Sequence, residues 1–374
     1  MPDVIELLAD LVAIPSVNPM GSDANGPEFG EARMAEYVAG FLERHGVHVE
    51  RQAVLPGREN LLAHVVGRSE RGSILFETHM DTVRVDNMEI APFEPVQRDG
   101  KLYGRGSCDA KASLAAMMRT MVEARRRTPA MDVWLCAAVD EEYTFGGAAY
   151  LVRSGFRAGS ALVGEPTGLQ VVTAHKGAAR WRLTAHGRSA HSATPWEGEN
   201  AIYKMARVIS ALERHAGALQ AQTPHPRLGP RTLNVGTIEG GQTVNTVPDR
   251  CQITVDRRVL PGEDLATVAG SMDAFLAAEG LAGLVEVTEI LRDPPMELAQ
   301  DSPWAQTVLA AARQVVPADF AAVHYGTDAS KFAGAGMPSL VMGPGDIAQA
   351  HTANEWVRID EVRAAVEVYS HLVG

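Results

Sequence analysis

Cysteine, net positive charge and long hydrophobic runs are all scarce in this 374-residue chain. The three cysteines, Cys108, Cys136 and Cys251, form no CxxC pair and leave an odd count, which suits a reducing compartment better than a disulfide scaffold. A formal net charge of -12 argues against nucleic acid or an anionic membrane as the main partner, because an acidic surface attracts neither. No apolar run approaches transmembrane length, so we expect no membrane span.

The first residues, MPDVIELLADLVAIPS, lack the basic start and the long apolar core of a signal peptide, and their spacing predicts an amphipathic helix. We therefore expect a soluble, cytoplasmic protein. HExxH, GxSxG and P-loop motifs are also missing, which removes the commonest rival enzyme classes. MGPGDIA matches a weak dinucleotide fingerprint, but too few residues follow it for the βαβ unit that the fingerprint needs.

Two hydrophobic patterns divide the chain into two predicted domains. In residues 1–174, short apolar runs such as SILFETH and DVWLCAAVDEE alternate with helical segments, which is typical of a mostly parallel sheet covered on both faces. The same pattern returns in 292–374, where PSLVMGPG precedes a helix predicted over 359–372. We expect these two segments to form one discontinuous α/β catalytic domain.

Residues 175–291 follow a different pattern, in which helices predicted over 200–215 and 263–279 alternate with strands in the order β-α-β-β-α-β. In CQITVDRR, apolar and polar residues alternate, so the helices are expected to cover one face of a sheet and to leave a polar face free. The Pro-Pro pair of RDPPM marks one boundary. The segment is predicted to be an inserted, ferredoxin-like α+β domain.

Acids and histidines collect where the predicted parallel strands end, in a glycine-rich turn before a helix, and after the last strand. These residues are His79, Asp81, Asp109, Glu141, Glu142, Glu165 and His351. Ligands of open α/β sheets bind beyond the carboxyl ends of the strands, so the side chains meet if the strands are neighbours. Such a cluster of charge is prohibitive unless cations neutralise it.

The donor types narrow the choice of cation. Imidazole and carboxylate without thiolate suit zinc, with cobalt or manganese as substitutes. If one carboxylate is shared, five such ligands can hold two ions about 3.5 to 4 Å apart, as in two-metal hydrolases. The sequence therefore predicts a two-metal site.

Five segments, ETHMDTV, GRGSCDAK, DEEYTFGG, GEPT and GPGDIAQAH, occur in the order found in the M20 family of metal-dependent peptidases and amidohydrolases, and the chain resembles that family over its whole length. GPGDIAQAH is most similar to the acetylornithine deacetylase branch. The resemblance implies that His79, Asp109 and Glu165 hold one zinc ion. It also implies that Asp109, Glu142 and His351 hold the second, so that Asp109 and a water bridge the two.

The same resemblance implies that Glu141 is the general base that takes a proton from the bridging water. Asp81 is expected to accept the proton on the far ring nitrogen of His79 and so to fix the tautomer of that ligand. Without the family motifs, Glu141 and Glu142 would equally fit the start of a solvated loop.

The inserted domain supplies candidate substrate-binding residues. The resemblance implies that His191, in GRSAHSATP, reaches into the active site of a partner subunit, although His191 alone also fits a surface turn. Asn245 and Arg258 are the other candidates, and the Arg258 guanidinium suits a substrate carboxylate. Thr327, in YGTDASKF, matches a family loop near the substrate. We expect a homodimer formed through the inserted domain, and we expect that domain to close as a lid over the site.

The preferred interpretation is a di-zinc hydrolase of N-acyl amino acids, such as an acetylornithine deacetylase of arginine biosynthesis. A succinyl-diaminopimelate desuccinylase, a dipeptidase or a carboxypeptidase is the nearest alternative. A non-catalytic metal-binding or interaction protein on the same fold is a more remote one. That last alternative predicts a missing ligand or base, whereas all the motif positions are intact.

Overall fold

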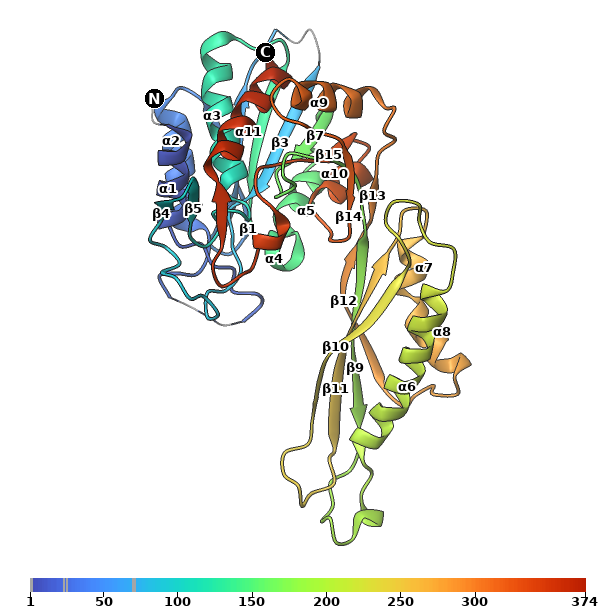
Figure 1. The fold of residues 1–374 in the computed structure, drawn as a ribbon. Coiled ribbons are helices and arrows are strands. Elements are labelled where there is room, and N and C mark those ends of the chain that lie inside the picture. The colour runs from blue at the N-terminus through green and yellow to red at the C-terminus, as the bar shows by residue number, and fades with distance from the viewer. Residues whose placement is uncertain (1–2, 23, 25, 69–71) are drawn as a thin grey trace. The chain divides into compact units, whose positions relative to one another are not determined.

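The computed structural model describes residues 3–22, 24, 26–68 and 72–374. The chain divides into two compact units, each with its own sheet and helices (Figure 1). Unit 1 comprises Met1–Thr173, Glu297–Ala321 and Thr327–Gly374, and unit 2 comprises Ala174–Met296 and Ala322–Gly326. Within the described residues, no helix is long and apolar enough to span a bilayer.

Unit 1 is built on a nine-stranded sheet. Its strands are β1 (His48–Leu55), β2 (Arg58–Val65), β3 (Ser73–His79), β6 (Asp132–Ala138), β7 (Ser160–Val163), β8 (Val171–His175), β13 (Met296–Glu297), β14 (Phe320–Val323) and β15 (Ser339–Val341). The order is β1-β2-β6-β3-β7-β15-β8-β13, with β14 beside β8. The four central strands, β6, β3, β7 and β15, are parallel, and antiparallel neighbours flank them. The predicted α/β class with a mostly parallel sheet is confirmed.

The helices of unit 1 are α1 (Val4–Ala13), α2 (Ala32–Arg44), α3 (Lys111–Arg127), α4 (Glu141–Thr144), α5 (Gly146–Arg153), α9 (Pro303–Arg313), α10 (Ala329–Gly334), α11 (Ile359–Val373) and the short 3-10 turn η2 (Ile347–Gln349). A small second sheet joins β4 (Val96–Arg98), β5 (Lys101–Tyr103) and β16 (Trp356–Arg358) in the order β16-β5-β4. The α3 helix packs against the sheet and also against α1, α2 and α11. It is therefore buried on nearly all sides.

The order of elements in unit 2 is β9 (Gly177–His186), the 3-10 turn η1 (Pro195–Glu197), α6 (Ala201–Gln220), β10 (Thr232–Gly240), β11 (Arg250–Val259), α7 (Leu265–Ala269), α8 (Ser271–Ala278) and β12 (Glu286–Asp293). The strands form an antiparallel sheet in the order β10-β11-β9-β12, which is the expected ferredoxin-like arrangement. The helix expected over 263–279 is divided at Gly270 into α7 and α8.

Alternation along β11 and β9 divides the sheet of unit 2 into two faces, as expected. Trp181, Leu183, Ile253 and Val255 are buried in one hydrophobic core with side chains of α6 and α8. Alternate residues of β11, from Gln252 to Arg258, are only partly buried and polar. The polar face of this sheet is thus available for charged side chains.

Candidate active site

Three neighbouring strands of unit 1 deliver acids and a histidine to one edge of the sheet. His79 is the last residue of β3 and pairs with Ala138 of β6. Glu141 follows β6 at the start of α4, and Glu165 follows β7. Because β6, β3 and β7 are adjacent and parallel, their carboxyl ends lie side by side. The structure therefore brings together residues that are far apart in the sequence.

Asp109 lies between two histidines. Its Oδ1 atom is 3.1 Å from His79 Nε2, and its Oδ2 atom is 3.2 Å from His351 Nε2. His79 Nε2 is also 3.7 Å from Glu165 Oε1, and His351 Nε2 is 3.2 Å from Glu142 Oε2. Each oxygen of Asp109 thus belongs to a different histidine-glutamate pair.

The donor atoms fit metal ions. Candidate ligand atoms of His79, Asp109 and Glu142 all lie within 4.8 Å of one another, and so do those of His79, Glu141 and Glu165. Among the described residues, the buried Oε1 of Glu142 has no hydrogen-bond partner, although such atoms are normally satisfied. Nitrogen and oxygen donors of this kind suit zinc and its borderline substitutes.

Burial and mutual repulsion act on the carboxyl groups of the cluster. Burial raises the pKa of both Glu141 and Glu165 well above the ordinary value, and neighbouring carboxylates add to the rise. Burial also opposes ionisation of Asp109, but hydrogen bonds from His351 and His79 outweigh it and lower the pKa of Asp109. Asp109 is therefore the carboxylate that the two imidazoles stabilise.

Both histidines sit in a strongly negative potential. The hydrogen bonds that His351 donates to Asp109 and Glu142 raise the pKa of its imidazole to about 10. Burial opposes protonation of His79, but the hydrogen bond to Asp109 and the charge of Glu165 raise its pKa well above the ordinary value. The potential that favours protonated imidazole also favours metal cations.

Asp81 contacts the cluster in a way that differs from the expectation. His79 Nδ1 is 2.9 Å from the backbone carbonyl oxygen of Asp81 and 3.7 Å from its carboxylate. The carboxylate instead accepts the backbone N–H groups of Glu141 and Glu142, at 3.2 and 3.1 Å. The carbonyl of Asp81 can therefore fix the tautomer of His79, while its carboxylate holds the start of α4.

Asp140 anchors the turn before the two glutamates, although the sequence suggested no role for it. Its φ is +64°, in the left-handed region. Its Oδ1 accepts hydrogen bonds from Arg58 Nη1 at 2.9 Å and from Asn18 Nδ2 at 3.0 Å. Asn18 Nδ2 also donates to Asp81 at 2.7 Å, and Arg58 pairs with the buried Glu31. No local motif marks Asn18, Glu31 or Arg58, so sequence reasoning missed them.

The loop before α10 places Thr327 and Asp328 in buried positions. Thr327 Oγ1 accepts the N–H of Ala329 at 3.2 Å. Asp328 lies against Glu77 of β3, and burial raises the pKa of Asp328 to about 6 and that of Glu77 well above its ordinary value. The two neighbouring carboxyl groups also repel each other when both are ionised, which adds to the rise in the pKa of Glu77. Thr327 itself is buried, and its hydroxyl contacts the backbone of its own loop.

Two expected substrate-binding residues lie together in unit 2. His191 and Asn245 occupy exposed positions on neighbouring loops, where the N–H of Ser192 donates to the Asn245 carbonyl at 3.0 Å. Arg258 lies at the other end of the same sheet, because Arg250 pairs with His186 whereas Arg258 pairs with Ala178.

Arg250 and Arg258 lie far apart along β11. From Arg250 to Arg258 the strand advances eight residues, or about 26 Å at roughly 3.3 Å per residue. Arg258 Nε donates to Asp256 Oδ1 at 2.9 Å, on the polar face. One copy of unit 2 therefore presents the His191 and Asn245 loops and Arg258 at two distant places.

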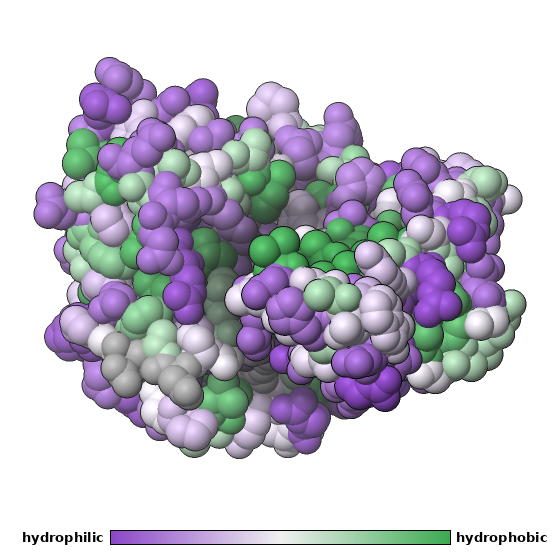
Figure 2. All heavy atoms as spheres, turned by 90° about the horizontal axis from the view of Figure 1, so that it is seen from below, coloured by the Kyte–Doolittle hydropathy of each residue, from purple (hydrophilic) through white to green (hydrophobic). Residues whose placement is uncertain are grey.

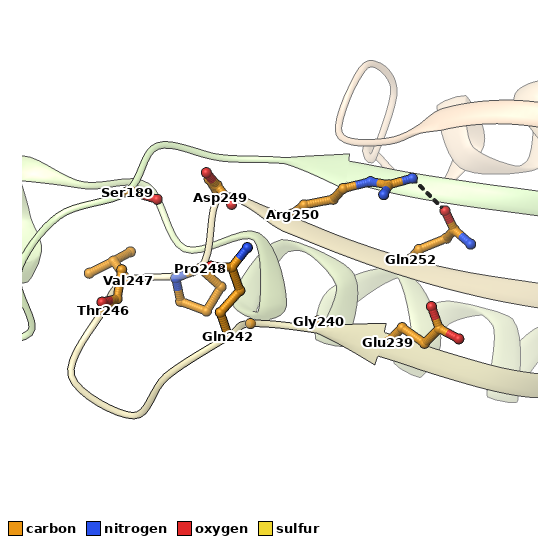
Figure 3. Close-up of a pocket in the computed structure, with 11 residues that line it drawn as sticks. Ser189, Glu239, Gly240, Gln242, Thr246, Val247, Pro248, Asp249, Arg250 and Gln252 are labelled. Carbon is orange, nitrogen blue, oxygen red and sulfur yellow. Dashed lines mark hydrogen bonds between the residues drawn. The ribbon is translucent and has the colours of Figure 1, made fainter.

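A small surface pocket of about 210 Å³ also lies at the loop end of unit 2 (Figure 3). It is lined by Ser189, Thr246, Pro248, Arg250 and Gln252 among others, and Arg250 donates to Gln252 at 2.7 Å. None of the acids and histidines of the unit 1 cluster lines it.

A second pocket beside these loops includes Tyr203 and Val244, which are highly exposed. Figure 2 shows hydrophobic side chains exposed among hydrophilic ones on the face seen from below.

Comparisons with known proteins agree on one family. The model of Peptidase family M20/M25/M40 matches residues 75–374. The acetylornithine deacetylase of Pectobacterium atrosepticum is 31% identical over an alignment of length 383, which covers 100% of this chain and 97% of that protein. Of the solved structures, an M20 family metallo-carboxypeptidase from Sulfolobus solfataricus has a TM-score of 0.85 at 20% identity, with 100% of this chain and 98% of that chain covered. A dinuclear metal-binding M20 peptidase from Bacillus subtilis has a TM-score of 0.71 at 15% identity, with 99% and 95% covered.

Proposed function

Because the chain belongs to Peptidase family M20/M25/M40 and is a metal-dependent amidohydrolase, we propose that it removes a small acyl group from an N-acyl amino acid, with N-acetylornithine as the best candidate. The observation that carries the proposal is the position of Asp109 between the His79–Glu165 pair and the His351–Glu142 pair. A carboxylate shared in this way is suited to bridge two metal ions.

In this proposal, His79, Asp109 and Glu165 hold one zinc ion, and Asp109, Glu142 and His351 hold the other. Cobalt or manganese could replace zinc, since all are compatible with these donors. When bound, the metals lower the pKa of a water molecule and polarise the amide carbonyl of the substrate. The carbonyl of Asp81 accepts the proton on Nδ1 of His79, so that Nε2 remains the donor to metal.

Glu141 moves the proton in this scheme. It takes a proton from the attacking water as the new C–O bond forms, and it then delivers that proton to the leaving amine as the amide C–N bond breaks. Glu141 is placed for this role because its carboxylate lies near His79 and Glu165, beside the proposed metal site. The products are a carboxylic acid and a free amino acid.

We propose that residues 175–291 form the dimerisation and lid domain. The exposed Tyr203 and Val244, near the His191 loop, support a contact between two copies. If His191 and Arg258 act on one substrate molecule, their distant positions within unit 2 require two copies. His191 and Asn245 of a partner would then stabilise the oxyanion, while Arg258 would bind the substrate carboxylate.

We predict the location of the enzyme from its cysteines and its pathway from the proposed reaction. The three cysteines are free and buried, which supports a reducing compartment such as the cytoplasm. Hydrolysis of N-acetylornithine would place the enzyme in arginine biosynthesis, and the 31% identity to an acetylornithine deacetylase supports that choice.

A panel of substrates tests the proposal. The metal-loaded enzyme would be offered acetyl, succinyl, formyl and aminoacyl derivatives of ornithine, citrulline, lysine and diaminopimelate, and the released amine would be measured. We expect the highest kcat/KM with an acetylated amino acid. Cleavage of dipeptides or succinyl-diaminopimelate with no action on acetylated amino acids would favour the alternative activities and overturn the preferred substrate.

A further inference from the structure

One fully buried carboxylate outside the metal cluster, that of Glu355, holds the loop that carries Asp109. Glu355 Oε1 accepts the backbone N–H groups of Cys108 and Asp109, at 2.9 and 3.0 Å. Its Oε2 accepts the N–H of Gly106 at 3.1 Å and Nη1 of Arg105 at 2.7 Å. All four donors belong to residues 105–109.

The backbone continues the same attachment. The N–H of Gly104 donates to the carbonyl oxygen of Glu355 at 3.1 Å. The next residue, Trp356, begins β16 and pairs with Tyr103, the last residue of β5. The loop of Asp109 therefore begins, after the end of β5, beside Glu355, the residue just before β16.

Glu355 also belongs to the segment that supplies the second histidine. His351 lies four residues before it in the sequence HTANE. The side chain of His351 meets Asp109 directly, at 3.2 Å, while Glu355 holds the backbone of Asp109. The segment 351–355 thus supplies His351 and also holds the backbone of Asp109, although the two proposed ligands are far apart in the sequence.

The pair of Glu355 and Arg105 is costly to bury, since their side chains are 0% and 1% exposed. A fully buried ion pair gives little net stability compared with well-packed apolar side chains. Here each hydrogen bond that the Glu355 carboxylate accepts from a side chain or a backbone N–H comes from residues 105–109, in the loop of Asp109. The arrangement is better explained by the geometry that it imposes than by the stability that it adds.

We propose that Glu355, supported by Arg105, is a positioning residue that sets the distance between Asp109 and His351 and so tunes the affinity of the metal pair. The inference rests on the proposal that Asp109 and His351 bind metal. Glu355 itself does not touch substrate or metal.

Metal binding by purified Glu355→Gln protein tests this role without any assay of hydrolysis. Gln keeps the shape of the side chain but turns an N–H₂ group toward donors and removes the charge that faces Arg105. Zinc affinity would be measured by competition with a coloured chelator, and the absorption spectrum of the cobalt form would report ligand geometry. We expect zinc affinity about 10- to 100-fold weaker and an altered cobalt spectrum.

Glu263→Gln is the matched control. Glu263 accepts the backbone N–H of Leu260 at 2.8 Å and pairs with Arg231 and Arg257, so it has the same kinds of donor but lies in unit 2. Its substitution should leave zinc affinity unchanged. Glu355→Asp, which keeps the charge but shortens the side chain, replaces Glu355→Gln if the latter does not fold, and the same loss of affinity is expected.

Three results are distinguishable. A wild-type protein that binds no zinc contradicts the proposed function. Wild-type affinity and spectrum in the folded Glu355 variant, or a loss equal to that of Glu263→Gln, overturns the positioning role while leaving the proposed function intact. Selective loss of affinity in the Glu355 variant supports it.

Discussion

Asp81, which lies two residues beyond His79 in the sequence, accepts the backbone N–H of Glu141 with its carboxylate, at 3.2 Å. It thereby ties the carboxyl end of β3 to the first turn of α4. Successive residues of a helix point about 100° apart, so a helix that begins at Glu141 directs Glu141 and Glu142 differently. Glu142 meets His351, whereas Glu141 lies near His79 and Glu165. Adjacent glutamates can therefore have separate tasks.

Replacement of Asp81 by Asn should loosen this link. The amide N–H₂ of Asn would face the N–H groups that Asp81 now accepts, and we expect zinc affinity or kcat to fall by about 10- to 100-fold. Zinc titration and steady-state kinetics measure both. Asp264→Asn changes an equivalent helix cap, at Thr267 in unit 2, and should change neither quantity. Equal effects of the two substitutions would contradict the specific role of Asp81.

Complementation between two impaired variants, assayed at a substrate concentration far below KM, tests whether one catalytic site uses two copies of the chain. His191→Ala should lower kcat by about 100- to 1,000-fold through loss of an oxyanion donor. Arg258→Ala should raise KM for a substrate carboxylate. Co-expression of both variants at equal levels would make hybrid dimers for about half of the population, each with one intact site, and restore about a quarter of wild-type activity. Activity no higher than that of the single variants would contradict the two-copy site.

Because Lys111 is buried, we expect the stability of the metal-free protein to depend on pH. Burial lowers its pKa to about 7, and its Nζ donates to the carbonyl oxygens of Leu11 and Ile14. Between pH 7 and the ordinary lysine pKa of 10.5, the unfolded chain binds a proton that the folded chain does not, so the free energy of unfolding rises with pH. The contribution is roughly 1.4 kcal/mol per pH unit.

Urea unfolding of the wild type and of Lys111→Met across this pH range measures the contribution. Because the other titrating groups are common to both proteins, the difference between their unfolding free energies isolates Lys111. We expect that difference to increase in favour of the wild type as the pH rises. A constant difference would show that Lys111 titrates alike in the folded and unfolded chains.

Most of the fold and the acidic cluster could be predicted from the sequence, for a physical reason. Parallel strands bring their carboxyl ends to one edge, so residues such as His79 and Glu165 can be expected to meet without any knowledge of distances. Periodicity likewise predicts the two faces of the unit 2 sheet, since side chains alternate along a strand.

The supporting contacts could not be predicted in the same way. Asn18, Arg58 and Glu355 are single polar residues, and their partners are distant in the sequence. Hydrophobic periodicity does not mark a buried polar side chain, and the spacing HTANE gives no reason to expect that Glu355 holds the Asp109 loop. The division of a predicted helix at Gly270 depends equally on packing in unit 2.

We propose separate tasks for the two adjacent glutamates: Glu141 transfers protons, and Glu142 holds metal. The most direct test is to count bound zinc and measure turnover in Glu141→Gln, with Glu142→Gln as its partner. We predict that Glu141→Gln retains two zinc ions per chain and loses about 100- to 10,000-fold in kcat, whereas Glu142→Gln retains fewer ions. Loss of zinc from Glu141→Gln, or unchanged turnover with two ions bound, would contradict the account.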